Sequence, residues 1–356
     1  MKKVFLIAAA VVAFAACSKN EVLPSSSINN EISFNVAPRT KALAAGQIEF
    51  NKDLTFQTYA YYLPDGQTWA SHTTTPQTYI DNATIQFVDP QWKHATHTYY
   101  WPKQGKLTFL SWTAVKEDWT SGGKLVVNYG TNDATCAHDS GLKFSFDAVS
   151  DMNKDILVAD IAADKNANVS TYLATGVPTL FKHQLSYVVF KVRTDKDYTT
   201  AGKKFELNSI KFGASLSKSA TYQQIATTGV EAGWTEKAKG AQVYYDGGEH
   251  PADIKYDETV LTSNDTQNLY LPQTFDENGY EVTIQYTITT TEGTSTSKDV
   301  VTKTFSLNPS TGTKVFTTWE PGKKYTCTLT FSLNEITWDP AVQDWENVAD
   351  ADITIQ

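Results

Sequence analysis

The 356-residue sequence lacks the short motifs that mark common catalytic and cofactor sites. It has no H-E-x-x-H zinc motif, no paired Cys/His zinc set, no EF-hand loop, no P-loop and no G-x-S-x-G nucleophile elbow. Its 6 histidines form no ligand-spaced set. We therefore expect a protein without enzymatic activity, bound metal or cofactor.

Cysteine is also scarce. Beyond Cys17 the chain has only Cys136 and Cys327, which lie far apart in the sequence. An oxidising compartment would permit a bond between them. Two cysteines do not amount to a disulfide framework, however, and the sequence leaves their pairing open.

Basic residues are outnumbered, since the formal net charge is −9. Nucleic-acid binding requires clustered Lys and Arg to neutralise phosphates, so no nucleic-acid partner is expected. After residue 17 no apolar run approaches the roughly 20 residues that a transmembrane helix needs.

The N-terminus has the order of a secretory signal peptide. Lys2 and Lys3 precede an unbroken apolar run, Val4 to Ala16, which ends in small residues. The run is shorter than the roughly 20 residues of a membrane-spanning helix. Residues 1–16 are therefore predicted to be removed on export.

The residue after that run, Cys17, resembles the acylated cysteine of a bacterial lipobox, although Phe14 stands where Leu is usual. The resemblance implies a lipoprotein with a fatty acyl group, such as palmitate, on Cys17. An ordinary secretory signal that happens to contain a cysteine is the alternative. Residues 18–30 are polar and contain Pro24 and three consecutive serines, which predicts a flexible tether between the lipid and the folded part of the chain.

The rest of the composition favours β-structure. The chain has 18 Tyr, 17 Phe and 9 Trp, and aromatic and β-branched residues suit pleated, half-buried surfaces. Short alternating segments are separated by Gly, Pro and Asn, and no amphipathic helix with clear start and stop signals is found. The first such segment is residues 31–36, where Ile32, Phe34 and Val36 alternate with polar residues. These features predict an all-β protein made of antiparallel sandwiches.

The length after residue 16 favours two domains. The polar stretch before Val177-Pro178 contrasts with the apolar strand that follows it, which places the boundary there. The expected organisation is an N-terminal segment at 17–41, an N-terminal sandwich at 42–178 and a C-terminal sandwich at 179–356.

Aromatic residues are dense between positions 92 and 119, and they include Trp101 and Trp112. Exposed aromatic rings could stack on sugars, which suggests a surface glycan-binding lipoprotein as an alternative function. Rings at alternating strand positions more often fill a core, and this second interpretation is favoured.

Seven segments in order are similar to the fimbrillin family of type V pilus subunits. They are the lipobox with CSKNE, EISFNV before a basic loop, TYYWPKQGKLTFLSW, KDILVAD, LFKHQLSYVVFKV, LYLPQTF and WEPGKKYTCTLTFSLNEITWDPAVQDW. The resemblance covers nearly the whole chain. It implies two tandem transthyretin-like antiparallel β-sandwich domains and a role in adhesion.

The resemblance also implies a maturation mechanism. Subunits reach the outer membrane as lipoproteins, and a trypsin-like, Arg-specific protease then cuts in the loop after the first strand. The chain has two arginines, Arg39 in a soft loop and Arg193 at the end of a strongly patterned strand. Arg39 is the expected cleavage residue, and Lys41 is a weaker site. The cut would release the strand that carries Ile32, Phe34 and Val36.

Another subunit's strand would then fill the vacated groove, so the expected partners are other pilin subunits. The candidate donor is residues 346–356, where Ile353 and Ile355 alternate. A plain edge strand is the alternative for this segment. The expected function is therefore a stalk or tip subunit of a cell-surface pilus, with a lipid-retaining pilus anchor as a further alternative.

Overall fold

The computed structural model describes residues 30–36, 50, 52–116, 134–147, 154–167, 175–261, 269–311 and 315–344. Its named elements are β-strands and a short 3-10 helix, η3 (Thr199–Ala201). The all-β class predicted from the sequence is confirmed. Within the described ranges, no helix has the length and apolar character needed to cross a bilayer.

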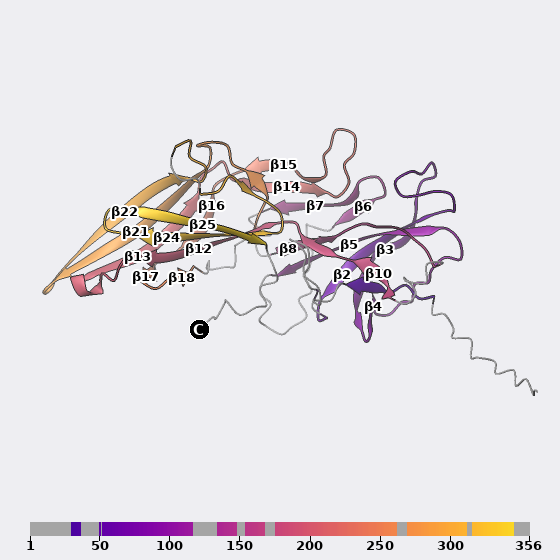
Figure 1. Cartoon of the computed structure of the whole chain (residues 1–356), viewed down its shortest axis with the longest axis horizontal. Coiled ribbons are helices and arrows are strands. Elements are labelled where there is room, and N and C mark those ends of the chain that lie inside the picture. The colour runs from indigo at the N-terminus through magenta and orange to yellow at the C-terminus, as the bar shows by residue number, and fades with distance from the viewer. Residues whose placement is uncertain are drawn as a thin grey trace, which may run out of the picture.

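The largest sheet has nine strands: eight in the order β10-β1-β4-β3-β2-β5-β8-β11, and β9, which pairs with β5. Its members are β1 (Phe34–Val36), β2 (Thr55–Leu63), β3 (Gln77–Val88), β4 (Gln91–His94), β5 (Lys106–Lys116), β8 (Lys154–Ala159), β9 (Ala162–Lys165), β10 (Val177–Thr179) and β11 (Phe181–His183). In Figure 1 these strands occupy one end of the molecule.

A four-stranded sheet, in the order β15-β14-β7-β6, packs beside the largest sheet. Its strands come from both halves of the chain: β6 (Thr135–Ala137), β7 (Gly141–Asp147), β14 (Ser217–Gln223) and β15 (Gly233–Lys239).

The remaining strands form two five-stranded sheets and a short pair. One sheet, in the order β18-β12-β24-β25 with β19 on β12, contains β12 (Ser186–Thr194), β18 (Thr259–Val260), β19 (Leu269–Tyr270), β24 (Lys323–Phe331) and β25 (Ile336–Asp344). The other, in the order β16-β13-β21-β22 with β17 on β13, contains β13 (Lys203–Phe212), β16 (Gln242–Asp246), β17 (Ala252–Ile254), β21 (Glu281–Glu292) and β22 (Ser295–Ser306). The pair is β20 (Gln273–Thr274) with β23 (Thr318–Trp319).

Most strand pairs are antiparallel, as predicted, but β1 is parallel to β10 and β12 is parallel to β24. The longest hairpin is β21–β22, in which Glu292 pairs with Ser295 and leaves a two-residue turn. Gly293 supplies the positive φ of 61° that such a tight turn requires. This hairpin extends at the end of the molecule opposite β4 and β10 (Figure 1).

The apolar segment at 324–338 spans parts of two strands, β24 and β25, with a turn at 332–335 between them. In β3, Asp81-Asn82 interrupts the apolar pattern. Asn82 has a φ of 45°, and the β2–β3 register shifts nearby, so β3 accommodates this polar pair as an irregularity within the strand.

The described apolar side chains form two clusters on opposite faces of the nine-stranded sheet. Along β8, Ile156 and Val158 belong to the larger cluster, whereas Leu157 and Ala159 belong to the smaller. This is the two-residue alternation of a strand that is buried on both faces. The smaller cluster contains Phe34 and Val36 of β1.

The nine-stranded sheet curls around the smaller cluster. In sheet order β1 is separated from β5 by β4, β3 and β2, yet the rings of Phe34 and Phe109 lie 5.6 Å apart. The stacked pair Phe50–Phe181 brings β11, at the opposite margin of the sheet, to the same cluster. The sheet therefore encloses its own core, and β1 lies where the two margins approach each other.

The predicted boundary after Pro178 falls inside β10, which belongs with β11 to the nine-stranded sheet. The first strand of the C-terminal sheets is β12, which begins at Ser186. The larger cluster joins Tyr59 and Trp112 to side chains of the C-terminal sheets, and β7 pairs with β14. The division into two tandem domains therefore stays a prediction.

Candidate functional site: the strand between β4 and β10

Residues 30–36 are hydrogen-bonded along both edges. At the start of the segment, the Ile32 amide donates to the Tyr99 carbonyl at 2.8 Å, and the Trp101 amide donates to the Asn30 carbonyl at 2.8 Å. On the other side, the Val177 amide donates to the Ser33 carbonyl at 2.7 Å. The segment then continues as β1, parallel to β10 and antiparallel to β4.

The apolar side chains of this segment point into the smaller cluster. The relative solvent-accessible surface areas of Ile32, Phe34 and Val36 are 3%, 4% and 9%. The Phe34 ring meets the rings of Phe56 and Phe109 edge-to-face at 5.5 and 5.6 Å. Such contacts add about 0.5–1.5 kcal/mol per pair beyond area burial. Phe34 is thus the central anchor of the segment.

The polar residues of the segment differ in their exposure and in their contacts. Asn35 is exposed, whereas Ser33 is buried although it is polar. The Glu31 carboxylate lies 3.3 Å from the Lys93 ammonium of β4. This partly exposed ion pair adds at most about 1 kcal/mol of stability.

A glycine permits the close approach of β10. Gly176, immediately before β10, has a φ of 83°, and a Cβ built on it would lie 2.7 Å from the Phe34 carbonyl carbon. Any other residue would be strained in this conformation and would push β10 away from β1. In the sequence, the only signal of this role for Gly176 is a glycine directly before a strand.

β10 depends on β1 for its place in the sheet. Among the described strands, β10 pairs with β1 alone, and β1 is its link to β4. Removal of β1 would leave unpaired backbone groups on both β4 and β10, with an apolar furrow between them. An unpaired sheet edge is a template for another extended strand.

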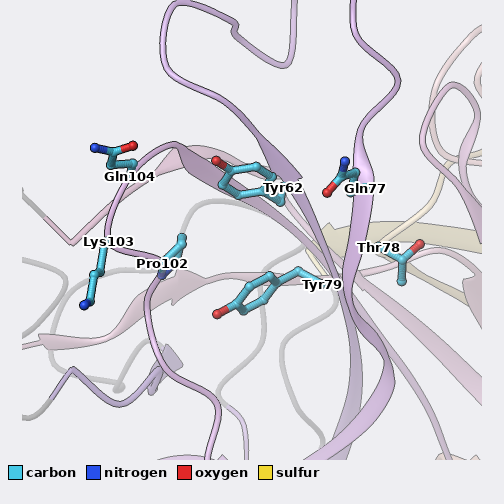
Figure 2. Close-up of a pocket in the computed structure, with 7 residues that line it drawn as sticks. All are labelled: Tyr62, Gln77, Thr78, Tyr79, Pro102, Lys103 and Gln104. Carbon is cyan, nitrogen blue, oxygen red and sulfur yellow. The ribbon is translucent and has the colours of Figure 1, made fainter.

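The segment 99–104, which binds the start of the strand, also borders a pocket of about 500 Å³. Figure 2 shows Tyr62 and Tyr79 on one side of the pocket and Pro102, Lys103 and Gln104 on the other. The Tyr79 hydroxyl donates to the Tyr100 carbonyl at 2.6 Å. This contact holds the backbone between the two residues that bond the strand, Tyr99 and Trp101.

The aromatic residues predicted as an alternative glycan platform are in the core. The relative solvent-accessible surface areas of Trp101 and Trp112 are 3% and 2%. Trp101 packs edge-to-face on Phe109, and Trp112 stacks on Phe144. Trp101, in the segment between β4 and β5, lies in the smaller cluster, and Trp112 of β5 lies in the larger cluster. Both rings are buried, so the glycan-binding hypothesis based on their exposure is wrong.

Several predicted residues lie outside the described part of the chain: Cys17, Arg39, Lys41, Ile353 and Ile355. Arg193, by contrast, lies within β12, opposite Thr330 of β24, and its Nε donates to the Thr330 hydroxyl at 3.0 Å. Its backbone is therefore held in a paired strand. Cys136 in β6 and Cys327 in β24 are free thiols and are not paired.

The structure also brings together residues that the sequence analysis left apart. His72, His138 and Asp139 each offer a metal-ligand atom within 4.8 Å of the others. His72 lies in the β2–β3 loop, and His138 and Asp139 lie in the β6–β7 turn. Residues so distant in sequence carry no spacing signal.

Comparison with known families gives a match to a family described as fimbrillin-like, over residues 40–345. A fimbrial protein of Bacteroides vulgatus is 17% identical, with a TM-score of 0.57 over 89% of this chain and 100% of that one. This likeness shows the fold alone.

Two further solved structures are more distant. A candidate cell adhesion protein of Bacteroides uniformis is 16% identical, with a TM-score of 0.43 over 88% of this chain and 98% of that one. The tip fimbrial protein Mfa3 of Porphyromonas gingivalis, with a C-terminal truncation, is 9% identical, with a TM-score of 0.31 over 82% and 94%. No curated protein matched the sequence.

Proposed function

The chain belongs to the fimbrillin-like family, and from this premise we propose that it is a stalk or tip subunit of a cell-surface type V pilus that polymerises by strand exchange. The family is one of structural and adhesion proteins, which points to a non-enzymatic role. In this proposal residues 1–16 direct export and Cys17 carries the lipid that holds the precursor at the outer membrane.

Maturation then removes the strand. A trypsin-like protease hydrolyses the peptide bond after Arg39, so that residues 30–36 are attached to the rest of the chain only through hydrogen bonds and packing. The observation that carries the proposal is the burial of Ile32, Phe34 and Val36 in a segment bonded on both edges. A segment placed in this way completes the sheet, and its departure leaves a groove of matching shape.

The size of the interaction explains why a cut is needed. Burial of three side chains of this type is worth about 4.5–9 kcal/mol in total. Each backbone hydrogen bond adds about 0.5–1.5 kcal/mol. While the strand is tethered, its high effective concentration disfavours any competitor. Cleavage removes that advantage, and an incoming strand can then compete on its own affinity.

The donor must present apolar side chains at every second position, because successive strand residues face opposite sides of the sheet. Residues 346–356 offer Ala351, Ile353 and Ile355 with this spacing. They begin two residues after the end of β25, the last described strand, which ends at Asp344 at the margin of its sheet. This position supports the segment as a donor.

The test of maturation is limited trypsin digestion of the folded full chain, followed by N-terminal sequencing and gel analysis for ladders of multimers. We expect a new N-terminus at Thr40 and polymerisation after the cut. Arg39→Ala should abolish the Thr40 N-terminus and slow polymerisation, and Arg39→Ala combined with Lys41→Ala, which also removes the weaker site, should abolish both; Arg193→Ala is the matched control and should behave as wild type. Normal polymerisation of the Arg39→Ala variant would reject the proposal.

A second experiment tests the donor. A chain that ends at Trp345, or one that carries Ile353→Asp and Ile355→Asp, should still be cut but should fail to extend polymers. Ladders of unchanged length from both variants would assign the donor role elsewhere. The N-terminal residue of the mature protein on cells separates a subunit from a retained anchor, since Thr40 marks a processed subunit and acylated Cys17 marks an anchor.

A further inference from the structure

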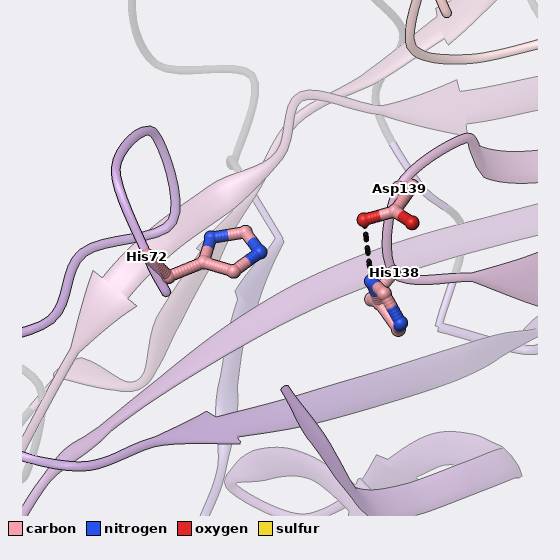
Figure 3. A group of neighbouring side chains, drawn as sticks. All are labelled: His72, His138 and Asp139. Atoms are coloured by element: carbon pink, nitrogen blue, oxygen red, sulfur yellow. Dashed lines mark hydrogen bonds and ion pairs between the residues drawn. The ribbon is translucent and has the colours of Figure 1, made fainter. Parts of the chain in front are cut away.

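Two histidines and a carboxylate converge at the surface between two sheets. His72 belongs to the loop that follows β2 in the nine-stranded sheet, and His138 and Asp139 belong to the turn that joins β6 and β7 in the four-stranded sheet. Their ligand atoms lie within 4.8 Å of one another. In Figure 3 the imidazole of His72 faces the other two residues from the opposite side.

The His72 ring is oriented as a metal-ligating imidazole should be. Its Nδ1 lies 3.0 Å from the Trp69 carbonyl oxygen, so Nδ1–H donates to that oxygen. The proton on Nδ1 leaves the Nε2 lone pair available. A backbone carbonyl that fixes the tautomer in this manner is the usual outer partner of a ligating histidine.

Aromatic packing holds both imidazoles near each other. The ring of Trp69 lies 6.1 Å from that of His72, and the ring of Tyr61 lies 6.4 Å from that of His138. The Tyr61 hydroxyl donates to the Cys136 carbonyl at 2.8 Å and so ties β6 to β2. The two parts of the cluster are thus held in place by contacts that do not involve the ligand atoms.

From this arrangement we propose that His72, His138 and Asp139 form a binding site for a divalent transition metal of the zinc type. Two imidazoles and one carboxylate are ligands that suit Zn²⁺. Ligand atoms around tetrahedral Zn²⁺ are roughly 3.4 Å apart, given bonds of about 2.0–2.1 Å, so small side-chain rotations complete the site. His138 Nδ1 now lies 2.6 Å from Asp139 Oδ1, and the metal takes the place of the proton between them.

The site leaves coordination positions for water or for a group from another molecule. The metal joins the β2–β3 loop to the β6–β7 turn and so stabilises the contact between two sheets. This role is separate from strand exchange, because none of the three residues contacts residues 30–36 in the described hydrogen bonds and ion pairs.

The test uses the full chain without a histidine tag and measures Zn²⁺ binding by isothermal titration calorimetry. We expect one saturable site per chain and a higher thermal unfolding midpoint with Zn²⁺. His72→Ala and His138→Ala should each weaken binding about tenfold or more, and Asp139→Asn should weaken it less. Cu²⁺ electron paramagnetic resonance should show coupling to two nitrogens in the wild type and to fewer in either histidine variant.

The chain offers a matched control. His94 and His97 also form a surface pair, with ring centroids 6.1 Å apart, but His94 Nδ1 accepts the backbone N–H groups of Thr96 and His97. The double variant His94→Ala/His97→Ala should bind Zn²⁺ as the wild type does. Absence of saturable binding in the wild type, unchanged binding in His72→Ala and His138→Ala, or loss in the double variant would overturn the proposal.

Discussion

The rings of Phe34 and Phe109 meet nearly at right angles, with an interplanar angle of 89° and centroids 5.6 Å apart, although three strands separate β1 from β5 in the sheet. This contact exists because the nine-stranded sheet curls around the smaller cluster. A six-residue segment near the N-terminus therefore closes a core that is built mainly by later strands.

The first prediction concerns this anchor. Phe34→Ala should lower the free energy of unfolding by about 3–5 kcal/mol, because it leaves a cavity among the other rings. Urea denaturation of the uncut protein measures the change. Asn35→Ala, at the neighbouring exposed position, should change the value by less than about 0.5 kcal/mol. Equal effects of the two substitutions would contradict the assigned facing of the strand.

The second prediction concerns Gly176. Alanine at this position would have to adopt a φ of 83°, which is strained for a residue with a side chain. Its Cβ would also lie 2.7 Å from the Phe34 carbonyl carbon, which is a steric clash. We expect a loss of at least about 1–3 kcal/mol in stability and faster release of the cut strand.

Gly229→Ala is the control for Gly176→Ala, since Gly229 has a φ of 81° and nothing lies within 4 Å of its built Cβ. It reports the cost of the backbone conformation alone. The difference between the two variants in denaturation experiments isolates the clash with β1, and no difference would mean that β10 and β1 are not in close contact.

The third prediction is that the cut protein binds its own strand in trans. A synthetic peptide of residues 30–36 should bind the protein from which that strand has been removed, and it should slow polymerisation. A peptide with Phe34→Asp should do neither, because it would bury an unpaired charge. Fluorescence anisotropy of labelled peptides gives the affinities, and a scrambled peptide controls for composition. Equal binding of all three peptides would argue against a specific groove.

The fourth prediction concerns thiol reactivity. Burial raises the pKa of the Cys136 thiol to about 11, so at pH 8 only about one thiol in a thousand is the reactive thiolate. Iodoacetamide should modify Cys136 slowly at pH 8 and faster as the pH rises. Burial also raises the pKa of Cys327, which should react only after unfolding. Peptide mapping by mass spectrometry distinguishes the sites.

The same shift makes stability depend on pH in the alkaline range. The pKa of Cys136 is higher in the folded state than the value of about 8.5 for an unfolded thiol. Its contribution to stability is therefore complete below about pH 8.5 and is lost as the pH rises toward about 11. Cys136→Ser should reduce the fall in unfolding free energy over this interval, as measured by denaturation at several pH values.

Sequence patterns predicted individual strands well where apolar and polar residues alternate. The segment with Ile32, Phe34 and Val36 is one example, and the burial of Trp112 within β5 is another. Where the pattern is interrupted, as at Asp81-Asn82, alternation does not identify the strand, because a bulge tolerates polar residues that a regular strand would exclude.

What the sequence determined by itself is the all-β class and the identity of the side chains that face inward, because a two-residue period is a local property of the chain. Only the tertiary structure decided which strands became neighbours. The position of β1 between β4 and β10, the fit of Gly176 against Phe34 and the meeting of His72 with His138 all depend on sheet curvature and on pairing between distant segments. Those contacts are selected by packing of the whole core, and no local pattern encodes them.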